Sequence, residues 1–473
     1  MGEASPLRPF YRPRSVAVVG ASQRETSSGG AVVRMMRKAG FTGRLYPVNP
    51  KGGTIAGLAA VTGLDALDGP VDLVVVAIRP DAILPAVEEA ARLGNRRFLI
   101  LPGGFREAGA EGVARERVLA ALAERYGLLI AGPNCGGLIR LDDDTRMAAT
   151  FFRDLPPGGG VAFVSQSGAL AEEMIAHAVA TAAPLGTVVS VGNALQLGIA
   201  EHLDFLAADP QTTAILLYFE SVADEETFIA AARRAARRKP VVALIPGRRR
   251  AARQAAAAHT GAAFPGERAI ARLIGRAGLV RAADLRALQL AMRAFGRFPH
   301  GIGERILILS NSGGPGVLCT DRAALMGLKL PDLPHAMAAR LKAALPPECA
   351  IRNPLDILAD ARADRFGLCF DAALACAHAF DAILMIHVVP FMVDAEPVVA
   401  CLAEKARMAP WPVMHAMMGT LAHKTAWFAR LEAGGILAFD SVEDMATAAG
   451  LLARTRRTRA CLGAENATAA RPE

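Results

Sequence analysis

Short apolar runs alternate with helical stretches along this chain from residue 15 onward. The first five runs are Ser15–Val19, Arg44–Val48, Leu73–Ile78, Phe98–Leu101 and Leu128–Ile130. Helical periodicity occupies intervals between them, as over Ala82–Leu93 and Gly112–Tyr126. Strand, crossover helix and strand in repeated order predict a parallel, doubly wound sheet. We expect this first domain to close near Asp142–Asp144, after the turn-rich segment Gly132–Gly137.

The same alternation begins twice more. The second cycle follows Pro156–Gly160, and its expected strands are Val161–Val164, Val188–Val191, Ala214–Tyr218 and Val241–Ile245, with a closing helix at Arg281–Arg297. The third cycle follows a linker at Pro299–Gly303, and its expected strands are Arg305–Leu309, Ala382–Ile386, Val413–His415 and Ile436–Ala438. In both cycles the first strand runs into a small polar segment that ends in Ser-Gly, which indicates two related flavodoxin-like domains.

These cycles predict an α/β protein with three domains and a short tail. The first is a Rossmann-like domain over residues 1–143, and two flavodoxin-like, doubly wound domains follow over 155–298 and 304–462. The polar segment 463–473 is expected to be disordered.

Composition narrows the class of protein. The 473 residues are 52% hydrophobic, yet no apolar stretch reaches the length of about 18 residues that a membrane span needs. The segment Met1–Pro13 has no apolar core, so it does not resemble a signal peptide. Seven cysteines without a CxxC pair are typical of reduced thiols in a cytoplasmic protein. We therefore expect no membrane association.

The net charge of +8 raises the question of nucleic-acid binding. Arginine dominates the basic residues and stands at helical spacing among Ala and Glu, which favours solvated helix faces. An aromatic content of 5% also argues against a surface that stacks single-stranded bases. We expect no nucleic-acid partner, and a positive surface would equally suit a polyanionic small ligand.

In open parallel sheets ligands bind beyond the carboxyl ends of the strands, so candidate chemistry is sought in the loops there. Gly20-Ala21-Ser22 follows the first strand, where a glycine lets a phosphate approach the backbone at a helix start. Ser22 stands where the GxGxxG fingerprint needs its second glycine, so a dinucleotide site is the weaker interpretation. Lys51 and the Pro102-Gly103-Gly104 turn could each contact an anion. Taken alone, Lys51 is more often a solvated lysine, and the turn is equally a tight turn without a ligand.

Two distant segments suggest a phosphorylated histidine. Ser165-Gln166-Ser167-Gly168 joins a strand to a helix start, which is an anion site without a cationic side chain. His259 lies in a loop after the last strand of the same cycle, and imidazole is a competent phosphoryl acceptor. Glu220, at a strand end, could accept a hydrogen bond from its second nitrogen. Taken singly, His259 and Glu220 are more often an ordinary loop histidine and a surface acid.

Other nucleophiles and metal sites receive little support. Cys135 lies in a Pro-Asn-Cys-Gly turn and is better interpreted as a buried cysteine than as a nucleophile. The remaining eight histidines show no metal-ligand spacing, so no metal site is expected.

Ordered motifs over nearly the whole chain carry a resemblance to one family. They are VAVVGAS, YPVNPK, GPNCGGL, FVSQSGAL, VSVGN, AADPQTTAILLYFES, AAHTGA, ILSNSGGPGV and NPLDI. In this order the chain resembles the alpha-type part of NDP-forming acyl-CoA synthetases, relatives of the succinyl-CoA synthetase alpha subunit. Ala258, where the family commonly has Ser, and Gln196, in the segment after Asn193, depart from its pattern.

The resemblance implies a role for each candidate residue. His259 matches the phosphorylated histidine and Glu220 the acid that holds it. The positions matching contacts to coenzyme A are Gly20, Ala21, Ser22, Asn49, Lys51, Pro102, Gly103 and Gly104. The positions matching contacts to phosphate and substrate are Ser165, Gln166, Ser167, Gly168 and Asn193.

The resemblance also implies a partner. No ATP-grasp pattern follows residue 300, so a beta subunit of that fold would bind ATP or ADP and Mg²⁺ in a hetero-oligomer. The implied reaction is acid–CoA ligation with a small carboxylic acid, through acyl phosphate and phosphohistidine. Two alternatives stay open at this point: a non-catalytic CoA- or acyl-CoA-binding regulatory protein, and a nicotinamide-dependent dehydrogenase.

Overall fold

The chain forms two compact units in a computed structural model that describes residues 5–254 and 265–469. Unit 1 spans residues 1–292 and 462–473, and unit 2 spans residues 293–461. The division falls within two helices, α10 (Leu285–Arg297) and α16 (Val442–Ala469).

The first sheet of unit 1 is parallel and has the strand order β2-β1-β5-β6-β7. Its strands are β1 (Ser15–Val19), β2 (Arg44–Val48), β5 (Leu73–Val76), β6 (Arg97–Ile100) and β7 (Leu129–Ala131), and β3 (Thr54–Ile55) pairs separately with β4 (Leu58–Ala59). Its helices are α1 (Arg8–Tyr11), α2 (Ser28–Ala39), α3 (Pro80–Arg92) and α4 (Ala110–Tyr126). The five predicted runs are confirmed as strands; β5 is apolar throughout because it is buried along its whole length.

The second sheet of unit 1 has the order β14-β13-β12-β10-β11-β8-β9. Its parallel strands are β10 (Val161–Ser165), β11 (Leu185–Ser190), β12 (Ala214–Tyr218), β13 (Val241–Leu244) and β14 (Val280–Arg281). An antiparallel hairpin of β8 (Gly137–Leu141) and β9 (Arg146–Thr150) extends one edge. The helices are α5 (Gly168–Thr181), α6 (Ile199–Ala208), α7 (Glu225–Arg238), α9 (Glu267–Ala277) and the first part of α10.

The hairpin changes where the first domain ends. Strand β8 pairs with β11, so the boundary predicted at residue 143 falls inside a hairpin of the second sheet. The acidic run that suggested a domain end is the hairpin turn, in which the Asp142 carboxylate accepts from the backbone N–H groups of Asp144 and Thr145 at 3.0 and 2.7 Å. An Asp that bonds its own backbone two or three residues on is typical of a turn.

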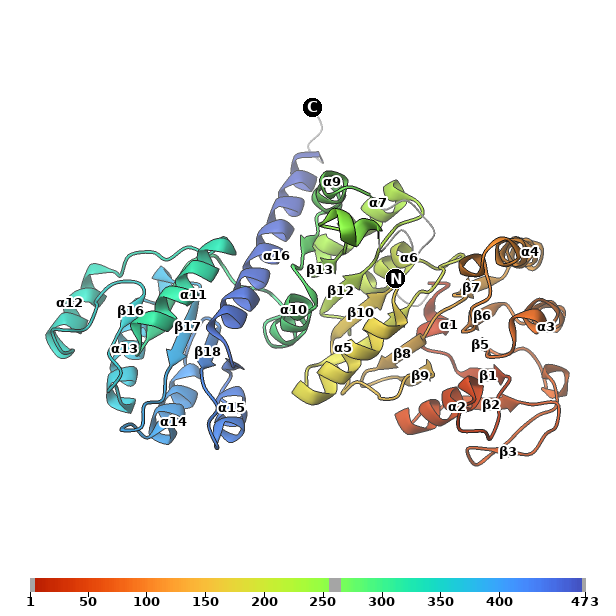
Figure 1. Cartoon of the computed structure of the whole chain (residues 1–473), viewed down its shortest axis with the longest axis horizontal. Coiled ribbons are helices and arrows are strands. Elements are labelled where there is room, and N and C mark those ends of the chain that lie inside the picture. Colours follow the sequence, from red (N-terminus) through yellow and green to blue (C-terminus); the bar gives the residue numbers. More distant parts are fainter. Residues whose placement is uncertain (1–4, 255–264, 470–473) are drawn as a thin grey trace. The chain divides into compact units, whose positions relative to one another are not determined.

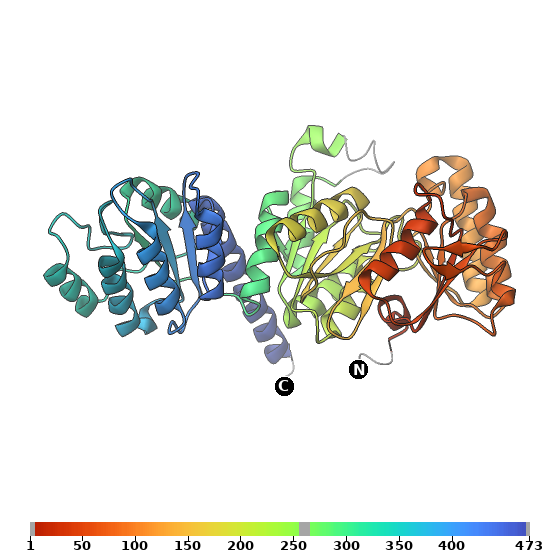
Figure 2. The same cartoon turned by 90° about the horizontal axis from the view of Figure 1, so that it is seen from below.

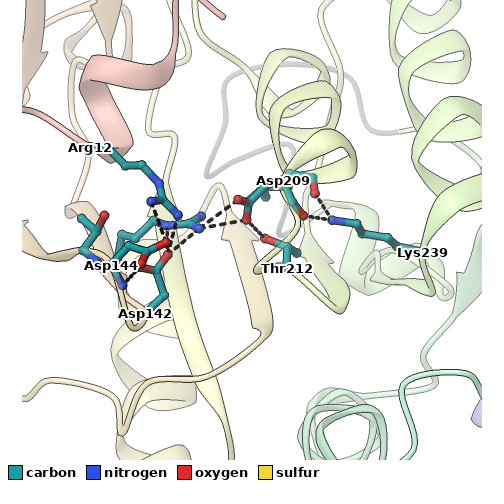
Figure 3. Close-up of polar contacts among 9 residues, drawn as sticks. Arg12, Asp142, Asp144, Asp209, Thr212 and Lys239 are labelled. Carbon is teal, nitrogen blue, oxygen red and sulfur yellow. Dashed lines mark hydrogen bonds and ion pairs between the residues drawn. The ribbon is translucent and has the colours of Figure 1, made fainter. Parts of the chain in front are cut away.

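Buried charges fasten this hairpin to its surroundings. Arg140, which is 1% exposed, donates from Nε to Asp142 and from Nη2 to both oxygens of Asp209 at 2.9 and 3.0 Å. The Thr212 hydroxyl donates to the Asp209 carboxylate, and Lys239 donates to the Asp209 backbone carbonyl. Arg12 of the N-terminal segment donates to Asp142 at 3.1 Å (Figure 3). Such a network holds its segments in one arrangement, since loss of any partner leaves a buried charge unpaired.

Unit 2 contains the third sheet, which is parallel and has the order β16-β15-β17-β18-β19. Its strands are β15 (Ile306–Ser310), β16 (Leu355–Asp356), β17 (Ala382–His387), β18 (Val413–Met417) and β19 (Leu437–Phe439). Helices lie on both faces of these strands (Figures 1 and 2), and they are α11 (Gly313–Leu325), α12 (His335–Ala344), α13 (Ala363–Ala375), α14 (Ala395–Ala406), α15 (Lys424–Ala433) and most of α16.

The same order underlies all three sheets. Counting the parallel strands of each in chain order, every sheet runs second, first, third, fourth, fifth. The predicted doubly wound α/β class is thereby confirmed. In this strand order the connections change from one face of the sheet to the other between the first and third strands. In sheets of this class ligands bind at that switch point.

The C-terminal segment differs from its prediction. Helix α16 continues through Ala469, so residues 463–469 are helical where a disordered tail was expected. Leu462 is 3% exposed and packs beside Gly278, and Glu465 forms an ion pair with Arg233. These contacts extend the helix, because packing stabilises a helix more than its intrinsic propensity does.

Candidate functional site

A cavity of about 530 Å³ lies in unit 1 at the carboxyl end of the second sheet. Loops after β6, β7, β10, β11 and β12 line it, together with the first turns of α6 and α7. Gln166 follows β10 and Glu220 follows β12, so both belong to the switch point of this sheet. Apolar side chains such as Leu195, Ile199 and Val222 share the walls with these polar groups.

Gln166 fixes the position of the Glu220 loop. Its Oε1 accepts from the backbone N–H groups of Glu220 and Ser221 at 2.6 and 3.2 Å, and its Nε2 donates to the Ser221 carbonyl at 2.7 Å. The Tyr218 hydroxyl donates to the Glu220 carboxylate at 2.8 Å. Burial, and then the hydrogen bond to Glu220, raise the pKa of Tyr218, which therefore keeps its proton and remains a donor.

The Ser165–Gly168 turn is held by its own serines. Ser165 is buried, and its hydroxyl donates to the Ser167 carbonyl at 2.8 Å and accepts from the Ser167 N–H at 3.0 Å. The Ser167 hydroxyl caps α5 by accepting from Leu170 N–H at 3.3 Å. The first N–H groups of a helix have no partner within it, so the start of α5 presents donors and a partial positive charge next to Gln166.

Asn193 connects the loops of the two sheets. Its Nδ2 donates to Glu107 at 2.6 Å and to Glu116 at 3.0 Å, while its Oδ1 accepts from Asn134 at 3.3 Å. Arg106 donates to the Asn193 carbonyl and to Glu116. The side chain predicted to contact substrate is thus engaged within the protein, at the wall of the cavity.

Glu107 was missed by the sequence prediction, and it closes the Pro102–Gly104 turn. Its Oε1 accepts from the N–H groups of Gly104 and Phe105 at 2.5 and 3.1 Å. Burial acts to raise the pKa of Glu107, but the hydrogen bonds from Asn193 and from these backbone groups outweigh it and lower the pKa. In the sequence Glu107 is an acid three residues after the Gly103-Gly104 turn, and that position alone does not distinguish it from a solvated surface acid.

The other residues predicted to contact coenzyme A lie elsewhere, at the carboxyl ends of β1 and β2. Gly20 has φ of +90°, and a Cβ there would lie 2.4 Å from the Ala77 carbonyl oxygen, so the turn needs glycine. Asn49 joins the loops, since its Nδ2 donates to the Ala21 carbonyl at 2.8 Å and its Oδ1 accepts from Lys51 N–H at 2.9 Å.

Beyond this turn, α2 begins at Ser28, and the Ser27 hydroxyl caps it. The exposed Lys51 adds a cation to the same edge. A glycine turn, a helix start and a lysine at one edge fit a ligand that carries a pyrophosphate. A hollow of about 590 Å³ beside it is lined by Gln23, Arg34 and neighbours, and Arg34 is a cation that the sequence prediction did not name.

The structure therefore brings the candidates together in two groups. Gln166, Asn193 and Glu220 share the cavity, and Gly20, Ala21, Ser22, Asn49 and Lys51 share the edge of the first sheet. His259 lies outside the described residues. Its role stays a prediction.

Three further features bear on alternatives. Cys135 is confirmed as buried, and burial raises the pKa of its thiol to about 12. Within residues 5–254 and 265–469, no three His, Cys, Asp or Glu side chains are grouped to hold a metal ion. In the same described part of the chain, no helix combines the length and apolar character needed to cross a membrane.

Two family models match the parts of the chain that contain the first and second sheets. Residues 14–140 match the family model described as a CoA binding domain, and residues 158–295 match the succinyl-CoA ligase like flavodoxin domain. The chain is 31% identical over 446 residues to the acetate–CoA ligase [ADP-forming] II subunit alpha of Pyrococcus furiosus, with 93% of this chain and 96% of the relative covered.

A second relative is longer. The chain is 36% identical over 365 residues to the acetate–CoA ligase [ADP-forming] I of Archaeoglobus fulgidus, which covers 76% of this chain but 51% of the relative. The chain spans about half the length of such curated relatives. Among solved structures, the dinucleotide forming acetyl-coenzyme A synthetase 1 of Ca. Korarchaeum cryptofilum, in complex with phosphate and ADP, matches with a TM-score of 0.90 and 28% identity over 97% of this chain and 98% of that one.

Proposed function

The chain belongs to the family of NDP-forming acyl-CoA synthetases, as a protein of the alpha type, and from this premise we propose that it is the CoA- and acyl-carrying half of an acid–CoA ligase. The reaction consumes a small carboxylic acid, CoA and a nucleoside triphosphate. It yields acyl-CoA, the nucleoside diphosphate and phosphate.

One observation supports this proposal most. Glu220, Gln166 and the adjoining start of α5 meet at one cavity, at the switch point of the second sheet. This arrangement combines a carboxylate that can orient an imidazolium with helix N–H groups that can receive a phosphate. Tyr218 and Gln166 restrict the movement of Glu220, so the carboxylate is set in place before a substrate arrives.

The proposed chemistry has three balanced steps. A nitrogen of His259 attacks the terminal phosphorus of the nucleotide, and the diphosphate leaves. The carboxylate of the acid then takes the phosphoryl group from His259, which gives acyl phosphate and free histidine. CoA, as the thiolate, attacks the acyl carbon and inorganic phosphate leaves with the bonding pair. Relaying the phosphoryl group through His259 divides one difficult transfer into easier ones.

Glu220 would accept a hydrogen bond from the second imidazole nitrogen. The start of α5, from Ser165 to Gly168, would hold the phosphate. Asn193 and the apolar walls would border the acyl group. CoA would lie along the first sheet with its pyrophosphate at Gly20–Ser22 and α2, within reach of Lys51.

The nucleotide requires a partner. We propose that an ATP-grasp beta subunit binds ATP or ADP with Mg²⁺ and that the two chains form a cytoplasmic hetero-oligomer. The comparison with a relative named subunit alpha supports this division, as does the half-length match to longer relatives. The second and third domains would then extend over residues 155–298 and 304–462, and the first would end before the β8–β9 hairpin rather than at residue 143, because β8 pairs with β11 of the second sheet.

Phosphohistidine labelling tests the function. The chain is incubated with its ATP-grasp partner, Mg²⁺ and ATP that carries a labelled γ-phosphate. We expect a label on the wild-type chain that is lost in acid and stable in alkali, none on His259→Ala, and full label on the control His300→Ala, which alters an exposed loop histidine. A labelled His259→Ala variant would refute the relay. A wild-type chain that binds CoA but takes no label would instead indicate the regulatory CoA-binding alternative.

A further inference from the structure

Glu107 lines the cavity from the side of the first sheet. Among the described residues, the carboxylates at the cavity are Glu107, Glu201, Glu220 and Asp224. Glu107 follows β6 of the first sheet, whereas the other three follow a strand of the second sheet or stand at the starts of α6 and α7. The acid that faces a ligand arriving along the first sheet is therefore Glu107.

A CoA molecule at the proposed site would extend toward this acid. Its pyrophosphate would lie beyond β1, at Gly20–Ser22, and β6 is the second strand from β1 in the sheet. Neighbouring strands stand about 4.8 Å apart, so the ends of β1 and β6 are separated by about 10 Å along one edge. The pantetheine arm, which joins the pyrophosphate to the thiol, is longer than this. The thiol can therefore pass the Pro102–Gly104 turn and enter the cavity.

Hydrogen bonds hold the Glu107 carboxylate in one orientation. Its Oε1 accepts from the N–H groups of Gly104 and Phe105 at 2.5 and 3.1 Å, and the carboxylate also accepts from Asn193 Nδ2, through Oε2, at 2.6 Å. A carboxylate oxygen can accept two hydrogen bonds, and Asn193 takes one of the two positions at Oε2. The other position can receive a proton, without a rearrangement of the side chain beforehand.

The surroundings of Glu107 keep it ionised. Burial acts to raise its pKa, but the hydrogen bonds that it accepts outweigh burial and lower the pKa below its ordinary value. The charged neighbours Arg106 and Glu116 pair with each other at 3.2 Å, and Arg115 donates to the Gly104 carbonyl. Glu107 is therefore a carboxylate at neutral pH, which is the form that accepts a proton.

We propose that Glu107 is the general base for the CoA thiol, an inference that rests on the proposed ligase function. The thiol proton passes to Oε2 of Glu107 while the sulfur forms its bond to the acyl carbon. The bond from this carbon to the phosphate oxygen breaks, and the phosphate leaves with the bonding pair. Glu107 then gives the proton to the departing phosphate, which becomes hydrogen phosphate. One proton thus moves from the thiol to the phosphate, and the protein is left unchanged.

The thiol step can be measured without nucleotide or partner. The purified full chain is given acetyl phosphate and CoA, and the formation of acetyl-CoA is followed. We expect Glu107→Gln to lower kcat about 100-fold, because a general base contributes roughly this much. The KM for CoA should change less than about threefold, because the glutamine oxygen still accepts from Gly104 and Phe105. Glu111→Gln, which alters an exposed acid of α4, is the control and should leave kcat unchanged.

The pH profile distinguishes a base from a residue that only holds the turn. Without the base, only CoA that is already ionised reacts, so kcat of Glu107→Gln should rise about tenfold per pH unit from about pH 6 to about 8.5, the ordinary pKa of a thiol. The wild type should rise much less over this range, and parallel profiles would overturn the proposal. Glu107→Ala, which also removes the bonds to the turn, should in addition raise the KM for CoA.

Labelling of His259 by acetyl phosphate separates this role from the proposed function. The transfer involves no thiol, so the wild type and Glu107→Gln should take labelled phosphate at the same rate, which also shows that the variant is folded. A wild-type chain that takes no label would refute the relay, while acetyl-CoA formation, which does not use His259, would still decide the role of Glu107. A wild-type chain that forms no acetyl-CoA, or a Glu107→Gln variant that forms it at the wild-type rate, would refute that role.

Discussion

The Ser-x-Ser-Gly turns of the second and third sheets form the same hydrogen bonds, but the loops that they hold carry different side chains. In each, a serine at the strand end bonds both the N–H and the carbonyl of the serine two residues on, Ser165 with Ser167 and Ser310 with Ser312. The intervening amide, Gln166 or Asn311, bridges to the loop after the third strand. The two turns therefore share the hydrogen bonds that hold the loops at the switch point of each sheet.

The difference lies in the loop that the amide holds. Strand pairing aligns Tyr218 with Ile386, which places Phe219 opposite His387 and Glu220 opposite Val388. The third sheet therefore lacks both the acid and the tyrosine that donates to it. Because the shared parts are retained and the Tyr–Glu pair occurs in one sheet alone, this pair is the part that we associate with chemistry.

Removing the acid should have the largest effect. We expect Glu220→Gln to lower the rate of phosphohistidine labelling by about 100-fold or more, because an amide cannot stabilise an imidazolium as a carboxylate does. Val388→Gln, the matching change in unit 2, should leave the rate unaltered. Rapid-quench labelling measures both, and equal effects would break the distinction between the two sheets.

The second largest effect concerns acid stability of unit 2. His387 and His415 are fully buried with rings 5.9 Å apart, and none of their nitrogen atoms has a hydrogen-bond partner among the residues that the structure describes. Burial lowers the pKa of His387 to about 4, and burial, the charge of His387 and Lys424 lower that of His415. Only the unfolded chain takes up these protons readily. The free energy of unfolding of unit 2 therefore decreases as the pH falls from 6.5 toward 4, by roughly 3 kcal/mol for His387.

Urea unfolding measures this loss, since both tryptophans, Trp411 and Trp427, report on unit 2. His387→Phe introduces the residue type found at the matching position of the second sheet, Phe219. This variant should reduce the change in the free energy of unfolding between pH 6.5 and 4. A wild-type unit 2 with constant stability over that range would contradict the expectation.

Removing the bridging amides should have intermediate effects. Gln166→Ala and Asn311→Ala each leave loop N–H and C=O groups unpaired, which costs on the order of 1–2 kcal/mol. Asn311→Ala should lower only the stability of unit 2, seen by tryptophan fluorescence. Gln166→Ala should also slow labelling, because the backbone of Glu220 is no longer fixed. Labelling that responded equally to both changes would show that the third sheet shares the chemistry.

The smallest effect is expected from Tyr218→Phe. Loss of one hydrogen bond to Glu220 should slow labelling about fivefold while leaving CoA affinity unchanged. Ile386→Val, at the matching position of unit 2, serves as the control. Unchanged labelling in Tyr218→Phe would show that the backbone bonds from Gln166 suffice to orient the acid.

The strands and the switch-point loops could be predicted from sequence because both depend on local patterns. Apolar runs give the strands, and small polar residues at their ends mark ligand loops. Arg140 and Glu107 could not be recognised in this way: a charged residue in a strand or after a turn looks solvated until distant partners, Asp209 and Asn193, reveal its burial or engagement. The same limit misled the placement of the first boundary, where an acidic turn resembled a linker.

The hairpin of β8 and β9 determines where the chain can be divided to make chimeras with its relatives. Strand β8 follows the last strand of the first sheet along the chain but belongs to the second sheet. Helix α2, which packs with the first sheet, contacts β9, since the Arg146 Nε donates to the Ala39 carbonyl at 2.7 Å. A chimera that exchanged residues 1–143 would replace one strand of the hairpin and retain the other. Exchange of the CoA-binding portion between relatives therefore requires a junction after Thr150, so that the hairpin and its α2 contact are inherited as one block.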